Sequence, residues 1–336
     1  MTTVNWEGPG RLLVVGGHGA VGRVVVDTLS GWYPGRVLAA GRSAPPGGVR
    51  VDVADPEGFG RVLDALGDIA AVVLCVEPPD ARTAVLCLSR GIHLVDVGAS
   101  HRLLDGVERA AGEAERTGAA AVLSVGVAPG LSNLLALRAH RDVGGAERID
   151  LTVLLGTGER HGRDAVRWTV TGLSAPSAAR SRRTALPGHG PRTAHPFPFS
   201  DQFTLPRTLG VPEVTTRLCL DSRPLTALLA ALRHSRLARR TALLTRVLGR
   251  VHLGGERFAV CAEAVRGPHR AARALTGSGQ SRTTGLVAAH TVREVLAGRV
   301  PPGVHHIEQL PALADLPERL ADQGIALWDS DPGTHP

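Results

Sequence analysis

Arg11-Leu-Leu-Val-Val-Gly-Gly-His-Gly-Ala-Val-Gly-Arg23 is an apolar run that breaks into glycines and then continues with helical spacing. Gly17, Gly19 and Gly22 fit the pattern G-x-G-x-x-G between a strand and a helix. Such glycines allow a tight turn, a close approach of the backbone to a pyrophosphate, and close packing of the helix on the strand. The stretch favours a dinucleotide site, and a purely structural glycine turn is the alternative. The expected contacts to the dinucleotide are Gly17, His18, Gly19, Ala20, Val21 and Gly22.

The chain has 336 residues, of which 43% are hydrophobic and 3% aromatic, and this length allows two domains. All 38 basic residues are arginine, and the formal net charge is +7. The lack of lysine excludes any mechanism that needs a Schiff-base or proton-carrying lysine. The arginines are dispersed and aromatic residues are few, so we expect no nucleic-acid partner. The positive charge suits a phosphorylated cofactor and a small carboxylate substrate.

The four cysteines, Cys75, Cys87, Cys219 and Cys261, show no C-x-x-C spacing. This pattern is typical of a reducing compartment and argues against structural zinc. No apolar run is long enough to span a membrane, and the N-terminus lacks the pattern of a signal peptide. We therefore expect a cytoplasmic protein without a membrane partner.

Strands and helices alternate from residue 11 to residue 125. Strands are predicted at 11–15, 36–41, 49–53, 70–76, 93–97 and 120–125, with helices near 20–29, 56–66, 81–90 and 103–117. Six strands alternating with helices predict an α/β fold, a Rossmann-type doubly wound parallel sheet with right-handed crossovers. In such sheets ligands bind outside the carboxyl ends of the strands.

The residues after the second strand favour NADP over NAD. NAD sites place an acidic residue about 20 positions beyond the glycines, and Arg42 followed by Ser43 stands there instead. A guanidinium binds a 2′-phosphate or stacks on adenine, so Arg42 predicts NADP (NADPH), and a surface arginine is the alternative. Asp52 lies near the adenine or is a solvated strand-end carboxylate. Val76 and Gly98, at two further strand ends, are also expected to contact the cofactor.

A second stretch, Val125-Gly-Val-Ala-Pro-Gly-Leu-Ser-Asn-Leu-Leu-Ala136, places a Pro-Gly turn before a helical pattern. Together with the glycines it resembles the saccharopine dehydrogenase-like family, which includes saccharopine reductase and carboxynorspermidine dehydrogenase. In that family a G-x-x-P-G-[LI] turn leads from the cofactor domain to the substrate domain. The resemblance implies that the Gly126–Gly130 turn lies over the nicotinamide and that Pro129 contacts the cofactor. Residues 158–169, 279–285 and 298–303 are similar as well.

The resemblance also implies the domain order. We expect an NADP-binding Rossmann domain at 1–130, an inserted α+β domain for substrate binding and dimerisation at 131–278, and a helical segment at 279–330 that packs back on the first domain. The expected assembly is a homodimer.

Periodicity predicts the elements of the second half. Residues 148–155 and 256–265 are predicted strands of a second sheet, 174–200 a loop or lid rich in Arg, Pro, Ser and His, and 224–248 and 284–297 helices. Four arginines of the first of these helices are assigned to a solvated face: Arg233, Arg236, Arg239 and Arg240.

Candidates for catalysis lie at strand ends. Asp96 and His101 bracket the exit of the fifth strand, and a histidine there is able to carry a proton near neutral pH. His161 is the third candidate, and Arg163 and Arg167 beside it are suited to a substrate carboxylate. The alternative for this group is a helix N-terminus with surface charges. Two other histidine positions are given ordinary roles: His195 is expected to be exposed, and His305-His306 lacks the further ligands of a metal site.

The family's proton transfer by Lys and His does not carry over to a chain without lysine, which makes saccharopine an improbable substrate. We expect an NADP-dependent oxidoreductase that transfers a hydride to a C=N (imine) or C=O bond of a small, carboxylate-bearing molecule in specialised biosynthesis. The alternatives are a non-catalytic NADP-binding regulatory protein and a synthase that uses the cofactor without net redox.

Overall fold

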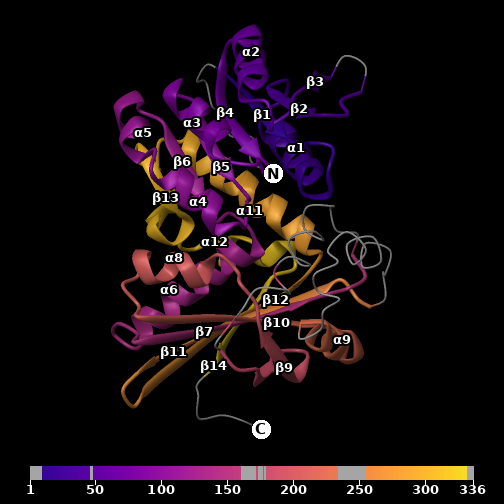
Figure 1. Cartoon of the computed structure of the whole chain (residues 1–336), viewed down its shortest axis with the longest axis vertical. Coiled ribbons are helices and arrows are strands. Elements are labelled where there is room, and N and C mark those ends of the chain that lie inside the picture. The colour runs from indigo at the N-terminus through magenta and orange to yellow at the C-terminus, as the bar shows by residue number, and fades with distance from the viewer. Residues whose placement is uncertain are drawn as a thin grey trace. The chain divides into compact units, whose positions relative to one another are not determined.

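The computed structural model of the chain describes residues 10–45, 48–159, 172, 177, 179–233 and 254–330. The chain divides into two compact units, Met1–Gly126 with Thr284–Leu316 and Val127–Thr283 with Pro317–Pro336. In the described part of the chain, each unit contains one seven-stranded sheet (Figure 1).

The first sheet has the order β13-β6-β5-β4-β1-β2-β3, and all of its pairings are parallel. Its strands are β1 Arg11–Val15, β2 Val37–Gly41, β3 Val49–Arg50, β4 Ile69–Leu74, β5 His93–Asp96, β6 Ala120–Leu123 and β13 Gly303–His306. The Rossmann-type fold class is confirmed. Two details differ from expectation: β3 is shorter than predicted, and β13 is a seventh strand that was not predicted.

The central strands are aliphatic because helices cover both faces of the sheet. Leu12, Leu13, Val14 and Val15 of β1 are at most 1% exposed. On one face, α2 Pro56–Leu66, α3 Arg82–Ser89, α4 His101–Glu108 and α5 Ala111–Thr117 share a hydrophobic core with alternate strand residues. Strand order and helix placement together define a doubly wound sheet.

Helix α1 Ala20–Trp32 extends beyond its predicted end and packs against α11 Gln280–Leu296. A Cβ atom at Gly285 would lie 2.6 Å from the Cβ of Val24, so only glycine fits at this helix contact.

The single helix predicted for 103–117 is two helices. The N–H of Ala110 donates to Val107 O, a tightened turn that ends α4 before α5 begins.

The second sheet has the order β14-β12-β11-β7-β10-β9-β8, in which β7 and β10 are parallel and the other pairings antiparallel. Its strands are β7 Arg148–Leu155, β8 Arg182–Leu186, β9 Gly190–Pro196, β10 Glu213–Leu220, β11 Arg257–Arg266, β12 His269–Ser278 and β14 Ala326–Ser330. The prediction of a loop or lid at 174–200 is wrong where β8 and β9 form a hairpin. Alternate residues of this hairpin, including Thr184, Leu186 and Ala194, are buried.

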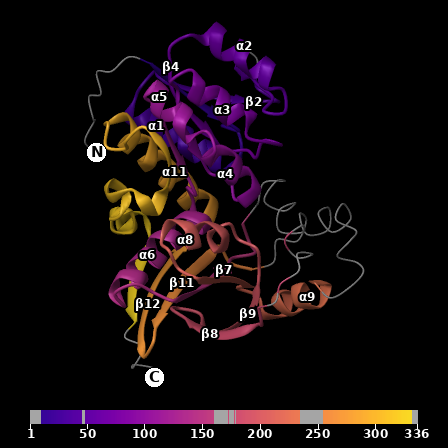
Figure 2. The ribbon, with the colours of Figure 1, turned by 60° about the vertical axis from the view of Figure 1, so that its left-hand side comes forward.

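Helices α6 Ser132–Asp142 and α8 Asp201–Thr208 cover one face of the second sheet, and the β8–β9 hairpin forms the edge of the sheet away from these helices (Figure 2). The helix predicted for 224–248 is described only as α9 Arg223–Arg233. Its predicted exposed residues Arg236, Arg239 and Arg240 lie outside the described residues.

The C-terminal part of the chain contributes to both sheets. From the sequence, all of 279–330 is expected on the first unit, whereas only β13 joins that sheet and β14 pairs with β12 in the second. Short helical turns connect the two strands: Ile307–Gln309, Pro311–Leu313, α12 Leu316–Arg319 and Ala321–Gln323. None of the described helices combines the length and apolarity needed to cross a bilayer.

Candidate cofactor and catalytic site

The glycine turn between β1 and α1 leaves no room for side chains. A Cβ atom at Gly22 would lie 2.1 Å from the carbonyl oxygen of Gly16, and one at Gly17 would lie 2.9 Å from Val14 O. Gly16 itself has φ +79°, in the left-handed region that favours glycine. The turn therefore presents bare backbone at the carboxyl end of β1, as the G-x-G-x-x-G pattern requires.

The N-terminus of α1 is suited to an anion. Its N-cap residue is Gly19, which offers no side-chain cap, and the first turn contains no acidic residue. The N–H groups of the first turn and the positive end of the helix dipole thus point toward the glycine turn without a competing carboxylate. This arrangement binds phosphate groups in other proteins.

His18 and Val76 flank the turn. The His18 ring approaches the end of β2, since a Cβ atom at Gly41 would lie 3.9 Å from its Cδ2. His18 Nε2 is buried and has no hydrogen-bond partner among the described residues. The Val76 side chain lies next to Gly16 of the turn: a Cβ atom at Gly16 would be 2.6 Å from Val76 Cγ1. A bound ligand would supply the hydrogen bond that this buried ring nitrogen lacks.

A hollow of about 510 Å³ lies beside the ends of β2 and β3. Its lining consists of Arg42, Arg50, Val51, Asp52, Asp55, Gly58, Arg61, Val62 and Ala65. Arg61 lies 3.9 Å from Asp55, and Asp52 Oδ1 accepts a 3.0 Å hydrogen bond from Ala54 N. Within the described ranges, Arg42 and Arg50 have no ion-pair or hydrogen-bond partner.

Two guanidiniums are thus available to an anion in this hollow. Ser43, next to Arg42, is exposed. The sequence does not identify Arg50 as a candidate, because no neighbouring motif distinguishes it from other surface arginines.

Asp96, at the end of β5, is a fully buried carboxyl group. Its Oδ1 accepts a 2.7 Å hydrogen bond from Gly98 N, while its Oδ2 is buried without a partner in the described part of the chain. Burial raises the pKa of Asp96 to about 7; the charge of Glu77 adds to the rise, and the Gly98 N–H opposes it. The neighbouring Cys75 stays a thiol, because burial raises its pKa to about 12. Asp96 is therefore able to exchange a proton near neutral pH.

His101 begins α4 at the same strand end as Asp96 and is half-buried. Asp96 and Gly98 are in direct contact at this strand exit, and His101 follows three residues after Gly98. His161, Arg163 and Arg167 lie outside the described residues.

Pro129 belongs to the second unit, where a cis peptide bond joins it to Ala128. The turn is tied to α6, because Asn133 Oδ1 accepts a 3.0 Å hydrogen bond from Gly130 N.

A buried polar chain at the carboxyl end of β6 was not foreseen. Ser124 Oγ lies 2.8 Å from His306 Nδ1, and His306 Nε2 lies 2.9 Å from Glu108 Oε1. His306 is 3% exposed and ends β13. His306 thus supplies a buried link within the first unit, in which His305 takes no part. Among the described residues, no group of three or more His, Cys, Asp or Glu side chains is arranged to hold a metal ion.

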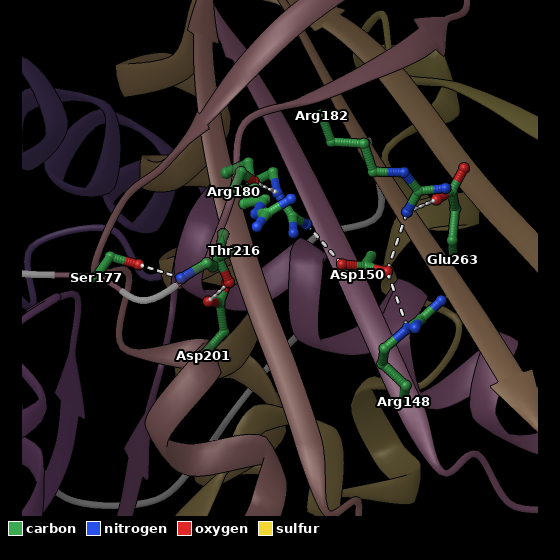
Figure 3. Close-up of polar contacts among 10 residues, drawn as sticks. Arg148, Asp150, Ser177, Arg180, Arg182, Asp201, Thr216 and Glu263 are labelled. Atoms are coloured by element: carbon green, nitrogen blue, oxygen red, sulfur yellow. Dashed lines mark hydrogen bonds and ion pairs between the residues drawn. The ribbon is translucent and has the colours of Figure 1, made fainter. Parts of the chain in front are cut away.

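The second unit holds a compact charge cluster around Asp150 on β7 (Figure 3). Asp150 pairs with Arg148 at 3.3 Å, Arg182 at 3.0 Å and Arg217 at 2.5 Å. Arg182 also contacts Glu263 of β11 at 2.5 Å, and burial raises the pKa of Glu263. Three guanidiniums thus share two carboxylates, and these contacts join β8 to β7, β10 and β11.

His195 is half-buried rather than fully exposed, and its Nδ1 lies 2.8 Å from Ser181 Oγ. Asp201, which is fully buried, accepts hydrogen bonds from Thr216 at 2.5 Å and Ser132 at 3.2 Å. The bond to Thr216 joins α8 to β10 (Figure 3), and the bond to Ser132 joins α8 to α6.

No model of a known protein family matches the chain, and no curated protein matches its sequence. Similar solved structures include DAP dehydrogenase of C. glutamicum in complex with DAP, at 16% identity and a TM-score of 0.48, covering 93% of this chain and 97% of that one. An engineered D-amino acid dehydrogenase bound to NADP+ has 15% identity, a TM-score of 0.48, and coverage of 94% and 98%. An amine dehydrogenase from Mycobacterium smegmatis has 13% identity, a TM-score of 0.41, and coverage of 90% and 96%. Similarity at this level assigns no activity.

Proposed function

We propose that this chain is an NADP-dependent oxidoreductase that transfers a hydride to a C=N or C=O bond of a small, carboxylate-bearing molecule. The observation that carries the proposal is the position of Asp96. This buried carboxyl group, with a pKa of about 7, lies at the same carboxyl edge of the sheet as the bare glycine turn.

The glycine turn fits a pyrophosphate. A Cβ atom at Gly17 or Gly22 would collide with backbone, and the first turn of α1 is free of acidic residues, so phosphate oxygens are able to approach the N–H groups of Gly19, Ala20 and Val21. His18 Nε2 gains a partner if it donates to the same phosphates.

Arg42 and Arg50 fit the 2′-phosphate that distinguishes NADP from NAD. Both lack a partner among the described residues and line one hollow with Asp52. An acidic residue at position 42 would repel that phosphate and bind a free ribose hydroxyl instead. Ser43 and Asp52 are proposed to contact the adenosine half.

The strand order supports one direction for the bound dinucleotide. β2 and β3 lie on one side of β1, and β4, β5 and β6 on the other. With its phosphorylated ribose at Arg42 and its pyrophosphate at the glycine turn, the dinucleotide runs its other half over the ends of β4 to β6. Val76, Asp96 and Gly98 lie at those ends.

Bound NADPH would supply a hydride, and the protein must provide the accompanying proton. Protonated Asp96 holds that proton on Oδ2, the oxygen without a partner in the described ranges. After the proton moves to the nitrogen or oxygen of the substrate, the Gly98 N–H stabilises the remaining carboxylate through Oδ1. Solvent protons restore the acid for the next turnover. His101, at the same strand end, is the second candidate for this role.

Other parts of the proposal come from the sequence. His161, Arg163 and Arg167 are proposed for the substrate carboxylate, and Pro129 for a contact to the nicotinamide. Membership of the saccharopine dehydrogenase-like family, a homodimer, a cytoplasmic location and a role in specialised biosynthesis are included as well.

The test is NADPH oxidation with a panel of imines, ketones and aldehydes, followed by NADP+ reduction with amines and amino acids, including DAP. Turnover of at least one compound, with NADPH preferred over NADH, supports the proposal. The variant Asp96→Asn is expected to bind NADPH like the wild type and to lose turnover. Tight NADPH binding without any turnover would favour the regulatory alternative, and turnover without net NADPH consumption would favour the synthase.

A further inference from the structure

Ser124, His306 and Glu108 form one continuous chain of hydrogen bonds in the first unit. The three residues come from the end of β6, the end of β13 and the end of α4. Ser124 is fully buried and His306 nearly so, while the Glu108 side chain is 30% exposed. The chain thus runs from the carboxyl edge of the sheet toward the surface.

The hydrogen bonds have a defined direction. A carboxylate only accepts, so Glu108 accepts from the Nε2–H of His306. In the neutral ring Nδ1 then carries the lone pair and faces the Ser124 hydroxyl, and the ring also accepts from the backbone N–H of Gln309. Glu108 therefore selects the tautomer that holds Ser124.

Ser124 needs such support because of its backbone. It has φ +58°, and among the described residues it alone combines a positive φ with a side chain. Non-glycine residues rarely adopt this conformation, and it persists where the surroundings fix it. The turn at Ser124 sets the direction in which the chain leaves β6 for Gly126–Gly130.

We propose that His306 is a positioning residue for this turn. By holding the Ser124 hydroxyl it fixes the left-handed conformation at the end of β6 and, through the chain that follows, the segment leading to Pro129. The contact of that segment with the nicotinamide half of NADP rests on the proposed function. Asn133 holds the far end of the segment through Gly130 N.

A pair of conservative variants separates the hydrogen bond of His306 to Ser124 from its hydrogen bond to Glu108. An asparagine amide reaches the position of Nδ1, so His306→Asn keeps the hydrogen bond to Ser124 and loses the hydrogen bond to Glu108. A glutamine amide reaches the position of Nε2, so His306→Gln keeps the hydrogen bond to Glu108 and loses the hydrogen bond to Ser124. Ser124→Ala removes the same bond from the other side. His305→Gln, at the half-buried neighbouring position whose ring contacts Pro301 O instead of Ser124 or Glu108, is the matched control.

Two probes report on two halves of the cofactor site: NADPH, and adenosine 2′,5′-bisphosphate, which lacks the nicotinamide. Ser124→Ala and His306→Gln are expected to weaken NADPH binding about tenfold, the effect of one lost hydrogen bond, without changing the affinity for the bisphosphate. The double variant should be no weaker than either single one. His306→Asn and His305→Gln should bind both probes like the wild type.

Equal weakening of both probes, or no weakening of either, would overturn the proposal. A wild type that binds neither probe refutes the proposed function instead. The positioning role is then decided by hydrogen exchange of the Val125 and Gly126 amides. Faster exchange in His306→Gln but not in His306→Asn supports it, and equal exchange in both refutes it.

Discussion

Asp96 accepts a 2.7 Å hydrogen bond from Gly98 N through Oδ1, whereas its Oδ2 is buried without a partner among the described residues. One oxygen is therefore held in place and the other is able to carry a proton. Because burial raises the pKa to about 7 from 3.8, the folded chain binds this proton more tightly than the unfolded chain does. The stabilisation is complete below the pKa of the unfolded carboxyl and is lost as the pH rises through about 7.

Asp96→Asn is expected to remove this pH dependence. At pH 8 the variant should have a higher free energy of unfolding than the wild type, by at most ~4 kcal/mol, with a much smaller difference near pH 4. Urea denaturation of both proteins at several pH values measures the difference. Asp52→Asn, at an exposed site, is the control and should show none. A constant difference between wild type and Asp96→Asn across this range contradicts the assignment.

The rate of reduction should follow the protonation of the same group. Asp96 acts as the acid, so kcat is expected to fall about tenfold per pH unit above pH 7, the pH near which Asp96 titrates. The reverse reaction needs the carboxylate and should show the opposite trend. A pH–rate profile in both directions is the measurement, and a rate of reduction that rises above pH 7 would exclude Asp96 as the proton donor.

Arg42→Ala should change cofactor preference. Loss of a charge-assisted contact to the 2′-phosphate is expected to weaken NADPH binding about 10- to 100-fold and to leave NADH binding unchanged. Arg61→Ala is the matched control, because Arg61 lines the same hollow but already lies 3.9 Å from Asp55. Fluorescence titration with both cofactors measures the affinities. Equal losses for NADPH and NADH would place Arg42 away from the phosphate.

Substitution of two glycines of α1 by alanine should change the free energy of unfolding in opposite directions. In Gly22→Ala the new Cβ meets Gly16 O at 2.1 Å, so the glycine turn must shift, at a cost of about 3 kcal/mol or more and with loss of NADPH binding. In Gly31→Ala the Cβ meets nothing within 4 Å, so the better helix propensity of alanine should stabilise the chain by about 0.5–1 kcal/mol. Thermal unfolding and NADPH titration of both variants test this, and tolerance of Gly22→Ala would contradict the described turn.

The Asp150 cluster should behave as a buried network. Asp150→Ala leaves Arg217 buried without its carboxylate and is expected to cost about 3–5 kcal/mol. Glu113→Ala removes the pair with Arg116, whose side chain is 67% exposed, and should leave the free energy of unfolding nearly unchanged. Denaturant unfolding of the two variants gives the comparison. Similar small losses in both would show that the cluster is solvated.

The first unit was largely predictable because its strands and helices carry strong local patterns. β1 and β4 are continuous aliphatic runs, and α2 begins at Asp55-Pro56, where Asp55 Oδ1 accepts from Gly58 N at 2.9 Å. The Rossmann-type fold class followed from this alternation and is confirmed. The catalytic and substrate residues stay predictions.

The missed elements depend on partners that are distant in sequence. β13 is four residues long and contains two histidines, so only its pairing with β6 makes it a strand. In the β8–β9 hairpin, the sequence contains Arg, Pro and His, so the alternation of buried and exposed positions is not visible as an alternation of apolar and polar residues. Ser124 and His306 are 182 positions apart, and no local pattern connects them.

The late positions of β13 and β14 in the sequence restrict the order in which the chain is able to fold. Each sheet receives one strand from residues beyond Pro302, so both sheets are incomplete while the earlier residues leave the ribosome. During that time the edges of β6 and β12 lack their final neighbours, and β6 is an entirely buried Ala-Ala-Val-Leu segment in the finished sheet. Exposed strand edges of this kind promote aggregation. A truncation after α11 would therefore remove one strand from each unit at once, and nascent chains should depend on chaperones until synthesis is complete.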